Sequence, residues 1–286
     1  MDCKRLCASL SWESQSFNYS TLHNLFYSSQ SMEFKQWIKL FSGVEEYWQN
    51  KKWLQKLENE HLWLEKRGVR LLAPWEKEYP QVLKELASPP FLSILGDLKV
   101  LSSPSMAVVG SRNPSSMSIN WLRSEFSEFL LKNQVTVISG GARGIDQEAH
   151  RICMSRKTPT ICFLPSGLAK VYPAEIVKWF ELIVLQGGAI VSQFSPFTRI
   201  YKSNFHRRNE LIVALSKATF VVEAKQRSGS LMTATKTVKW GKEVATLPSH
   251  PNSPTGRGSI QLLTEGAQML VDAQDLNIFW QRNNLG

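Results

Sequence analysis

Short apolar runs alternate with longer segments of helical length over the second half of the chain. Strands are predicted at Met106–Val109, Val135–Ile138, Thr160–Leu164, Ala189–Val191, Thr219–Val222 and Glu243–Leu247. Helices are predicted between them, at Ser118–Lys132, Ile145–Lys157, Ala174–Gln186, Phe205–Lys217 and Ser230–Gly241. Strands that are apolar along their whole length are buried on both faces, which indicates a mainly parallel sheet. We therefore expect an α/β fold of extended Rossmann-like type, with helices on both faces of the sheet.

The remaining segments have a different pattern. Residues 1–67 contain five of the ten tryptophans and predict a small helical N-terminal unit, in which tryptophans at helical spacing favour core or interface positions. Residues 68–105 form a leading segment, with a short strand at Val69–Leu72, a helical stretch from Tyr79 to Leu86 and an extended run at Pro89–Gly96. The Rossmann-like domain is expected over 68–286. A short helix and an edge strand are expected within Ile260–Asp275, and no C-terminal winged-helix domain is expected.

The net positive charge of the chain indicates nucleic acid or an anionic membrane surface as a possible partner. The chain has 286 residues, 43% of them hydrophobic, and a formal net charge of +10. The segment from Arg199 to Glu243 holds ten basic and three acidic residues, a net charge of +7. Basic patches are typical of proteins that bind nucleic acid or anionic membranes, but a charge run is also typical of a solvated helix face. The patch indicates binding only if it adjoins the glycine-rich loops described next.

The sequence shows no pattern of a metal-binding, disulfide-bonded, secreted or membrane protein. The four cysteines form no Cys-x-x-Cys pair and no histidine cluster accompanies them, so we expect free thiols and no metal site. The chain has no secretory signal pattern and no apolar run of membrane-spanning length. We expect a cytoplasmic protein without membrane insertion.

The strongest local motif lies between Val135 and His150. A β-branched run breaks into the loop Ser139–Gly144, and a helix follows with Asp146 in its first turn. A strand, a glycine loop and a helix N-terminus are how doubly wound domains build an anion site, because glycine lets backbone amides point at the ligand. Asp146 is placed to anchor this loop through backbone amides. His150, four residues later, shares its helix face, and a structural contact is favoured over a catalytic pair.

Loops that follow parallel strands gather at one edge of the sheet, where ligands bind. The candidate site residues at this edge are Ser111, Arg112, Ser139, Gly140, Gly141, Ala142, Arg143, Gly144, Tyr172, Phe205, Arg208, Asn209, Ser228, Gly229 and Ser230, and the loop-supporting residues are Asp146, His150 and Glu223. Amides, hydroxyls and guanidinium groups suit phosphate, and the aromatic rings suit bases. The residues alone predict a nucleotide or polynucleotide phosphate site. No Walker A motif, G-x-G-x-x-G fingerprint or nucleophile–base–acid set is present, so neither catalysis nor a cofactor is expected.

Taken together, the motifs resemble the DNA-processing protein A (DprA/Smf) family. The resemblance rests on Gly110-Ser111-Arg112, the loop and helix start from Ser139 to His150, Phe205-x-x-Arg208-Asn209, and the segment from Glu223 to Ala234 with Ser228-Gly229-Ser230, and it covers roughly residues 68–272. It implies a homodimer that binds single-stranded DNA, protects incoming DNA and loads the RecA recombinase in natural transformation, without catalytic turnover. It also implies that Arg112 contacts phosphate, that the Ser139–Gly144 loop and Asn209 shape the pocket, and that Phe205 takes a base.

Five positions depart from the family pattern: Ala169, Ala174, Gln193, Glu210 and Ser249. Positions 174 and 210 lack a basic residue of the family, and Lys170, Lys178 and Arg207 are candidate substitutes. The alternative function is a nucleotide hydrolase on a related Rossmann-like fold, similar to the cytokinin-activating phosphoribohydrolases, with Glu223 as its acid. Enzymes of that class have a motif similar to Pro-Gly-Gly-x-Gly-Thr followed by Glu, whereas this chain has Ser228-Gly229-Ser230 after Glu223.

Overall fold

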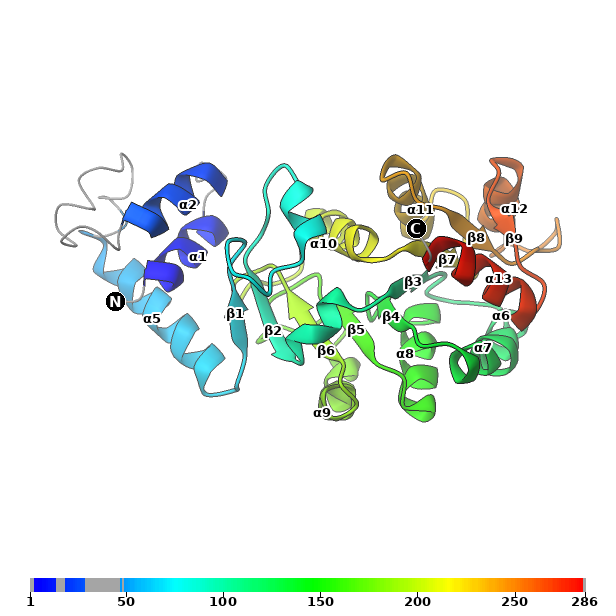
Figure 1. Ribbon diagram of the computed structural model, residues 1–286, viewed down its shortest axis with the longest axis horizontal. Coiled ribbons are helices and arrows are strands. Elements are labelled where there is room, and N and C mark those ends of the chain that lie inside the picture. The colour runs from blue at the N-terminus through cyan, green and yellow to red at the C-terminus, as the bar shows by residue number, and fades with distance from the viewer. Residues whose placement is uncertain (1–2, 14–18, 29–46, 48, 285–286) are drawn as a thin grey trace.

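The computed structural model describes residues 3–13, 19–28, 47 and 49–284, which build a nine-stranded sheet covered by helices (Figure 1). The strands are β1 (Arg70–Leu72), β2 (Leu92–Gly96), β3 (Ser105–Val109), β4 (Thr136–Ser139), β5 (Thr160–Phe163), β6 (Ala189–Ser192), β7 (Ala218–Val221), β8 (Val244–Thr246) and β9 (Gln268–Met269). The α-helices are α1 (Cys3–Glu13), α2 (Tyr19–Ser28), α5 (Lys51–Glu65), α6 (Ser116–Trp121), α7 (Ser127–Lys132), α8 (Ile145–Arg156), α9 (Phe180–Leu185), α10 (Lys202–Leu215), α11 (Gly229–Lys239), α12 (Arg257–Thr264) and α13 (Ala273–Asn284). Shorter turns are the 3₁₀ helices η1 (Gln81–Glu85), η2 (Leu98–Ser102) and η4 (Ala174–Trp179), and the π-helical η3 (Leu122–Phe126), which joins α6 to α7.

The sheet is mainly parallel, which confirms the prediction. Its strand order is β1-β2-β6-β5-β4-β3-β7-β8-β9, and every pairing from β6 to β9 is parallel. The extended run at Pro89–Gly96 contains β2, which pairs antiparallel with both β1 and β6. The segment before the Rossmann-like core therefore adds two strands to the sheet. The parallel strands have their carboxyl ends at one edge, which is where a ligand site is expected.

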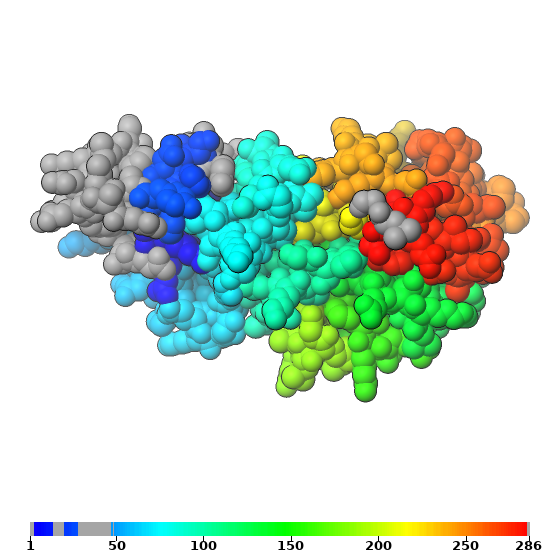
Figure 2. Space-filling view, in the orientation of Figure 1, coloured from blue at the N-terminus to red at the C-terminus, as the bar shows by residue number. Residues whose placement is uncertain are grey.

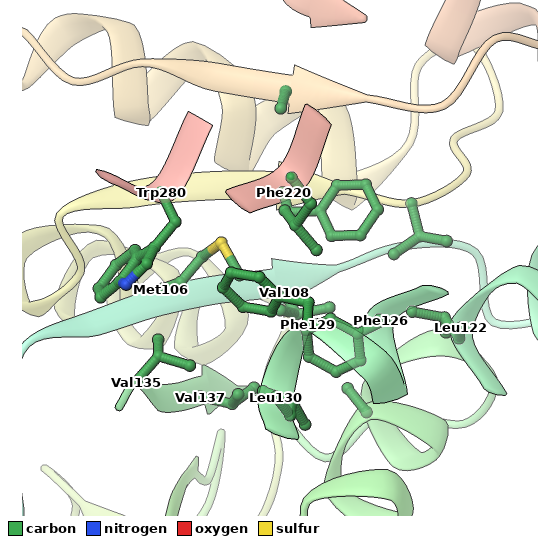
Figure 3. Packing of buried hydrophobic residues seen from close by; sticks show 14 of the residues in the cluster. Met106, Val108, Leu122, Phe126, Phe129, Leu130, Val135, Val137, Phe220 and Trp280 are labelled. Carbon is green, nitrogen blue, oxygen red and sulfur yellow. The ribbon is translucent and has the colours of Figure 1, made fainter. Parts of the chain in front are cut away.

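The strands are buried on both faces, which explains their continuous apolar sequence. Met106 and Val108 of β3 point to one face and pack with Phe126, Phe129 and Trp280 from the helices that cover it (Figure 3). On the other face, Ala107, Ile138 and Ile161 pack against Leu211 and Ile212 of α10. Burial of one phenylalanine side chain stabilises the fold by roughly 1.5–3 kcal/mol. The two layers of side chains therefore hold the sheet in place between α7, α8 and α13 on one side and α10 on the other.

Some helix boundaries differ from the sequence prediction. The segment Ala174–Gln186 is a 3₁₀ turn followed by a short α-helix, with Pro173 before it and only Ile176 and Ile183 buried in its two parts. Helix α13 was not predicted, although Leu276, Phe279 and Trp280 bury one face of it at helical spacing. No helix in the described part of the chain is long and apolar enough to cross a membrane.

The N-terminal helices form a separate cluster at one end of an elongated molecule, as the space-filling view shows (Figure 2). Leu10 of α1, Leu25 of α2 and Leu57 of α5 are buried there, together with Trp53. The cluster is joined to the sheet edge by the Glu60 carboxylate, which accepts a hydrogen bond from Ser195 Oγ at 2.6 Å. Of the other tryptophans in this region, Trp37 and Trp48 lie outside the described residues.

Candidate functional site

The carboxyl ends of β3, β4 and β7 and the helices α10 and α11 surround a pocket of about 280 Å³, here called the glycine-loop pocket. Its walls include the predicted residues Ser111, Arg112, Ala142, Asp146, Phe205, Arg208, Asn209, Ser228, Gly229 and Ser230. The topology thus brings residues that are far apart in the sequence to one edge of the sheet. Asn113, Lys225 and Thr233 also line the pocket, and sequence analysis missed them as site residues. Each lies within four positions of a predicted residue, which was the signal available for finding it.

The loop after β3 presents an arginine to the pocket. A Cβ atom at Gly110 would lie 2.6 Å from Ile145 Cγ1, so glycine lets the start of α8 pack directly on this turn. The Ser111 amide donates to the Glu223 carbonyl oxygen at 2.7 Å, and the Ser111 carbonyl oxygen accepts from the Ile145 amide at 3.1 Å. These two bonds fix the backbone, while the Arg112 side chain is exposed with its guanidinium carbon 5.4 Å from the Phe205 ring centroid.

The backbone amides of the loop after β4 bind the carboxylate of Asp146, at the start of the following helix. The amides of Gly140 and Ala142 donate to Asp146 Oδ2 at 3.2 and 3.4 Å. Gly144 has a φ of +80°, and a Cβ atom there would lie 2.3 Å from the Ser111 carbonyl oxygen. Ser139 turns away from the pocket, because its hydroxyl donates to the Val108 carbonyl oxygen at 2.7 Å. The amides expected to face a ligand therefore face Asp146, whose pKa is raised by burial against the opposing effects of Arg208 and these amides.

Arg208 is the buried cation of the site. Its side chain extends from α10 and lies against the glycine loop, where a Cβ atom at Gly140 would be 1.7 Å from Arg208 Nη1. Nη1 donates to the Phe163 carbonyl oxygen at 2.9 Å, but Nε makes no hydrogen bond within the described part of the chain. Burial lowers the pKa of Arg208, whereas the Asp146 carboxylate raises it. An arginine stays protonated in proteins, so the pocket has a fixed positive charge with unused hydrogen-bonding capacity.

Helix α11 directs its N-terminus at the same pocket. Ser228 caps it by accepting a hydrogen bond from the Leu231 amide at 3.4 Å, and Gly229 and Ser230 form the first helical residues. The first amides of a helix lack intrahelical partners and favour anions. Asn209 Nδ2 donates to Thr233 Oγ1 at 2.9 Å, which ties α10 to α11 across the pocket.

The aromatic residues lie on the side of the pocket nearest β5. The rings of Tyr172 and Phe205 meet edge to face with centroids 6.3 Å apart, and Tyr172 is 41% exposed. A smaller cleft of about 30 Å³ lies here and shares Arg112, Phe205 and Arg208 with the main pocket. Arg143 lines this cleft but not the glycine-loop pocket, and its Nε donates to Glu175 Oε1 at 2.6 Å.

The three supporting residues make separate contacts. Glu223 accepts hydrogen bonds from both Ser115 Oγ and Ser118 Oγ, at 2.5 and 2.6 Å. These bonds and others together lower its pKa despite the opposing effect of burial. His150 Nδ1 lies 2.8 Å from Thr160 Oγ1, and burial lowers the His150 pKa to about 4. No hydrogen bond joins His150 to Asp146 in the described residues, so the geometry contains no acid–histidine pair at this position.

The basic residues that could replace those missing at positions 174 and 210 lie in three different environments. The Arg207 guanidinium carbon is 5.4 Å from the Phe194 ring centroid, and Lys178 Nζ is 5.6 Å from the Trp179 ring centroid. Lys170 lines a separate groove beside Tyr172. Of the departures from the family pattern, Glu210 lies 3.9 Å from Lys236 Nζ in an ion pair.

Comparisons with known proteins identify the family. The model of the family described as DNA recombination-mediator protein A matches residues 70–281. Protein Smf of Escherichia coli is 36% identical over 224 residues, 78% of this chain and 59% of that protein, and Protein Smf of a Synechocystis species is 33% identical over 74% of this chain and 54% of its own length. The chain thus spans little more than half of these two relatives.

Two solved structures are also similar. DNA processing protein A of Streptococcus pneumoniae superposes with a TM-score of 0.73 at 25% identity, covering 96% of this chain and 92% of that one. DNA processing protein A of Helicobacter pylori, described for its single-stranded DNA binding mode, gives a TM-score of 0.65 at 29% identity and covers 76% of this chain and 97% of that one. The family match, the identities and the shared fold agree, and the chain belongs to the DNA recombination-mediator protein A family.

Proposed function

We propose that the chain binds single-stranded DNA in the glycine-loop pocket and acts as a recombination mediator rather than as an enzyme. The observation that carries this proposal is the juxtaposition of Arg112, the buried Arg208 and the Phe205 ring in one pocket at the sheet edge. Guanidinium groups bind phosphate, and an aromatic ring stacks on any base, so this set grips a strand without reading its sequence. The Helicobacter pylori relative, described as binding single-stranded DNA, supports the choice of ligand.

The wider role follows from the same proposal. A protein bound along the backbone of a single strand covers that strand, and the family is described as one of recombination mediators. We therefore extend the proposal to protection of incoming DNA and loading of RecA in natural transformation. This role would be carried out by a homodimer in the cytoplasm.

The contacts of Glu223 favour binding over nucleotide hydrolysis. Its carboxylate lies beside the pocket but accepts hydrogen bonds from two serine hydroxyls and the Ser115 amide. A general acid or base needs an oxygen within reach of the reacting group, whereas this carboxylate is engaged in holding the loop after β3. Incubation with nucleoside monophosphates tests the alternative directly, since released base would support a hydrolase.

The main test is replacement of Arg112 by alanine. For single strands, each lost phosphate contact lowers the salt slope of log affinity by about 0.7, which corresponds to about a fourfold loss of affinity near 0.15 M salt. We expect this loss for Arg112→Ala, measured by fluorescence anisotropy with single-stranded and duplex oligonucleotides at two salt concentrations. Lys99→Ala is the matched control, because Lys99 is exposed in η2, which leads into the amino end of β3 at the opposite sheet edge. Equal affinity for duplex and single strands, unchanged in Arg112→Ala, contradicts the proposal.

A further inference from the structure

A second hollow lies beside the glycine-loop pocket, between the end of α5 and the loops that follow β5 and β6. Its volume is about 830 Å³. We call it the aromatic groove and define it by Trp63, Arg67, Lys170, Tyr172, Phe180 and Arg199. Helix α5 supplies Trp63 and, just beyond its end, Arg67. Since α5 leads into β1 at the edge of the sheet (Figure 1), these residues place the groove where the N-terminal unit meets the sheet.

Two contacts hold the walls of the groove together, one of them buried. The hydrogen bond between Ser195 and Glu60 connects α5 to the loop after β6. One turn further along α5, the Trp63 ring meets the Phe197 ring edge to face with centroids 5.9 Å apart. Both contacts join the same two elements, so the groove is formed without a ligand.

The lining of the groove suits a nucleic-acid strand. Arg67, Lys170 and Arg199 are exposed cations, and none of the described residues that line the groove is acidic. The Arg67 guanidinium carbon lies 4.3 Å from the Trp63 ring centroid, so a cation and an aromatic ring lie together on the wall of the groove. Proteins that bind single strands without sequence preference combine positive charge along the backbone with aromatic rings on which bases stack.

The small cleft shares lining residues with both the groove and the glycine-loop pocket. Tyr172 lines both the groove and the small cleft, and Arg112, Phe205 and Arg208 line both that cleft and the glycine-loop pocket. One strand can therefore pass from the pocket along Tyr172 into the groove without leaving basic and aromatic surface. The side-by-side arrangement of the three hollows is the observation on which the next step rests.

We propose that the aromatic groove is a second binding subsite for the same single-stranded DNA, with the N-terminal helical unit forming one of its walls. The inference rests on the proposed function and extends it, because it gives the strand a direction across the molecule and gives the N-terminal unit a part in binding. The strand leaves the glycine-loop pocket past Tyr172, its phosphates pass Lys170 and Arg199, and its bases reach Trp63 and Phe180.

A length series tests this path. Affinity is measured for oligodeoxythymidylates from about 4 to about 16 nucleotides, the range of single-strand site sizes. The double variant Lys170→Glu, Arg199→Glu should bind the shortest oligomers like the unaltered chain and the longest ones about fifteenfold more weakly near 0.15 M salt, as expected for two lost phosphate contacts. The matched control is Lys99→Glu, Lys132→Glu, which makes the same charge change at exposed positions near the amino ends of β3 and β4.

The outcomes separate the two proposals. Loss confined to long oligomers in the groove variant supports the subsite. If the groove variant and the control bind every length equally well, while Arg112→Ala weakens binding, the second subsite is wrong and the proposed function stands. If the unaltered chain binds no oligomer, the proposed function itself fails.

Photo-cross-linking provides a test that needs no variant. A long oligonucleotide with 5-iodouracil at successive positions is bound to the full chain and irradiated, and cross-linked peptides are identified by mass spectrometry. Cross-links to Tyr172 and Phe205 are expected from one part of the strand and to Trp63 or Phe180 from another. Cross-links confined to the first pair at every probe position would overturn the inference.

Discussion

Replacement of Gly140 by alanine tests the packing on which the site depends. The added Cβ atom would lie 1.7 Å from Arg208 Nη1, far inside van der Waals contact, so the guanidinium must move. Gly140 does not have the positive φ that would strain an alanine, so the backbone tolerates the change. The displaced Arg208 loses its hydrogen bond to the Phe163 carbonyl oxygen, at 2.9 Å in the unaltered chain.

The expected cost follows from that bond. A hydrogen bond to a charged group contributes about 1.5–3 kcal/mol, so unfolding in urea should show a stability loss of about 2 kcal/mol. Affinity for single-stranded DNA should fall with it, because the displaced guanidinium occupies the pocket. Gly229→Ala is the control for stability only: its Cβ atom would meet nothing within 4 Å, and alanine is favoured over glycine in a helix. If Gly140→Ala is as stable as Gly229→Ala and binds single-stranded DNA as tightly as the unaltered chain, the close approach of Arg208 to the loop does not matter and the reasoning is refuted.

Two further predictions concern buried titratable groups. The pKa of His150 is 6.5 in the unfolded chain and about 4 in the folded chain, so the unfolded chain takes up a proton first as the pH falls. The free energy of unfolding should therefore be about 2 kcal/mol lower at about pH 5 than at about pH 7. Urea unfolding at about pH 7 and about pH 5 checks this, and a His150→Gln variant with an unchanged pH dependence would contradict it. Glu223→Gln should lower the free energy of unfolding by about 2 kcal/mol, because the amide cannot accept all the bonds donated by Ser115 and Ser118. An unchanged urea midpoint would show that these bonds do not hold the loop.

The parallel core could be predicted because its signal is local. Each central strand is a short apolar run followed by a glycine or polar turn, and alternation with helical segments leaves few topologies. Strand β2 was predicted as an extended run but not as part of the sheet. Its partner β6 lies almost a hundred residues later, and antiparallel pairing of Ile94 with Val191 leaves no pattern within either strand alone.

The site was predictable in position but not in its internal contacts. Gly140, Arg112 and Arg208 could be assigned to one edge because each follows a strand or begins a helix near that edge. The sequence places Asp146 as an anchor for the loop amides, and the structure shows these bonds. It does not show that Arg208 is buried or that Ser139 turns away from the pocket, because both depend on side-chain directions set by packing. Arg143 illustrates the same limit, since its partner Glu175 is 32 residues away.

The occupied glycine loop has a consequence for how the strand is held and released. Since the amides of Gly140 and Ala142 already bind the Asp146 carboxylate, the loop carries its own counter-ion and needs no phosphate to keep its shape. A fixed ring of amides would demand one phosphate at one position, as nucleotide-binding loops do. Under the proposed function, side-chain cations and rings would hold the strand, and such groups accept phosphates and bases over a range of placements. A strand held in this way would be able to shift in register while it stays bound, as its transfer to a partner requires.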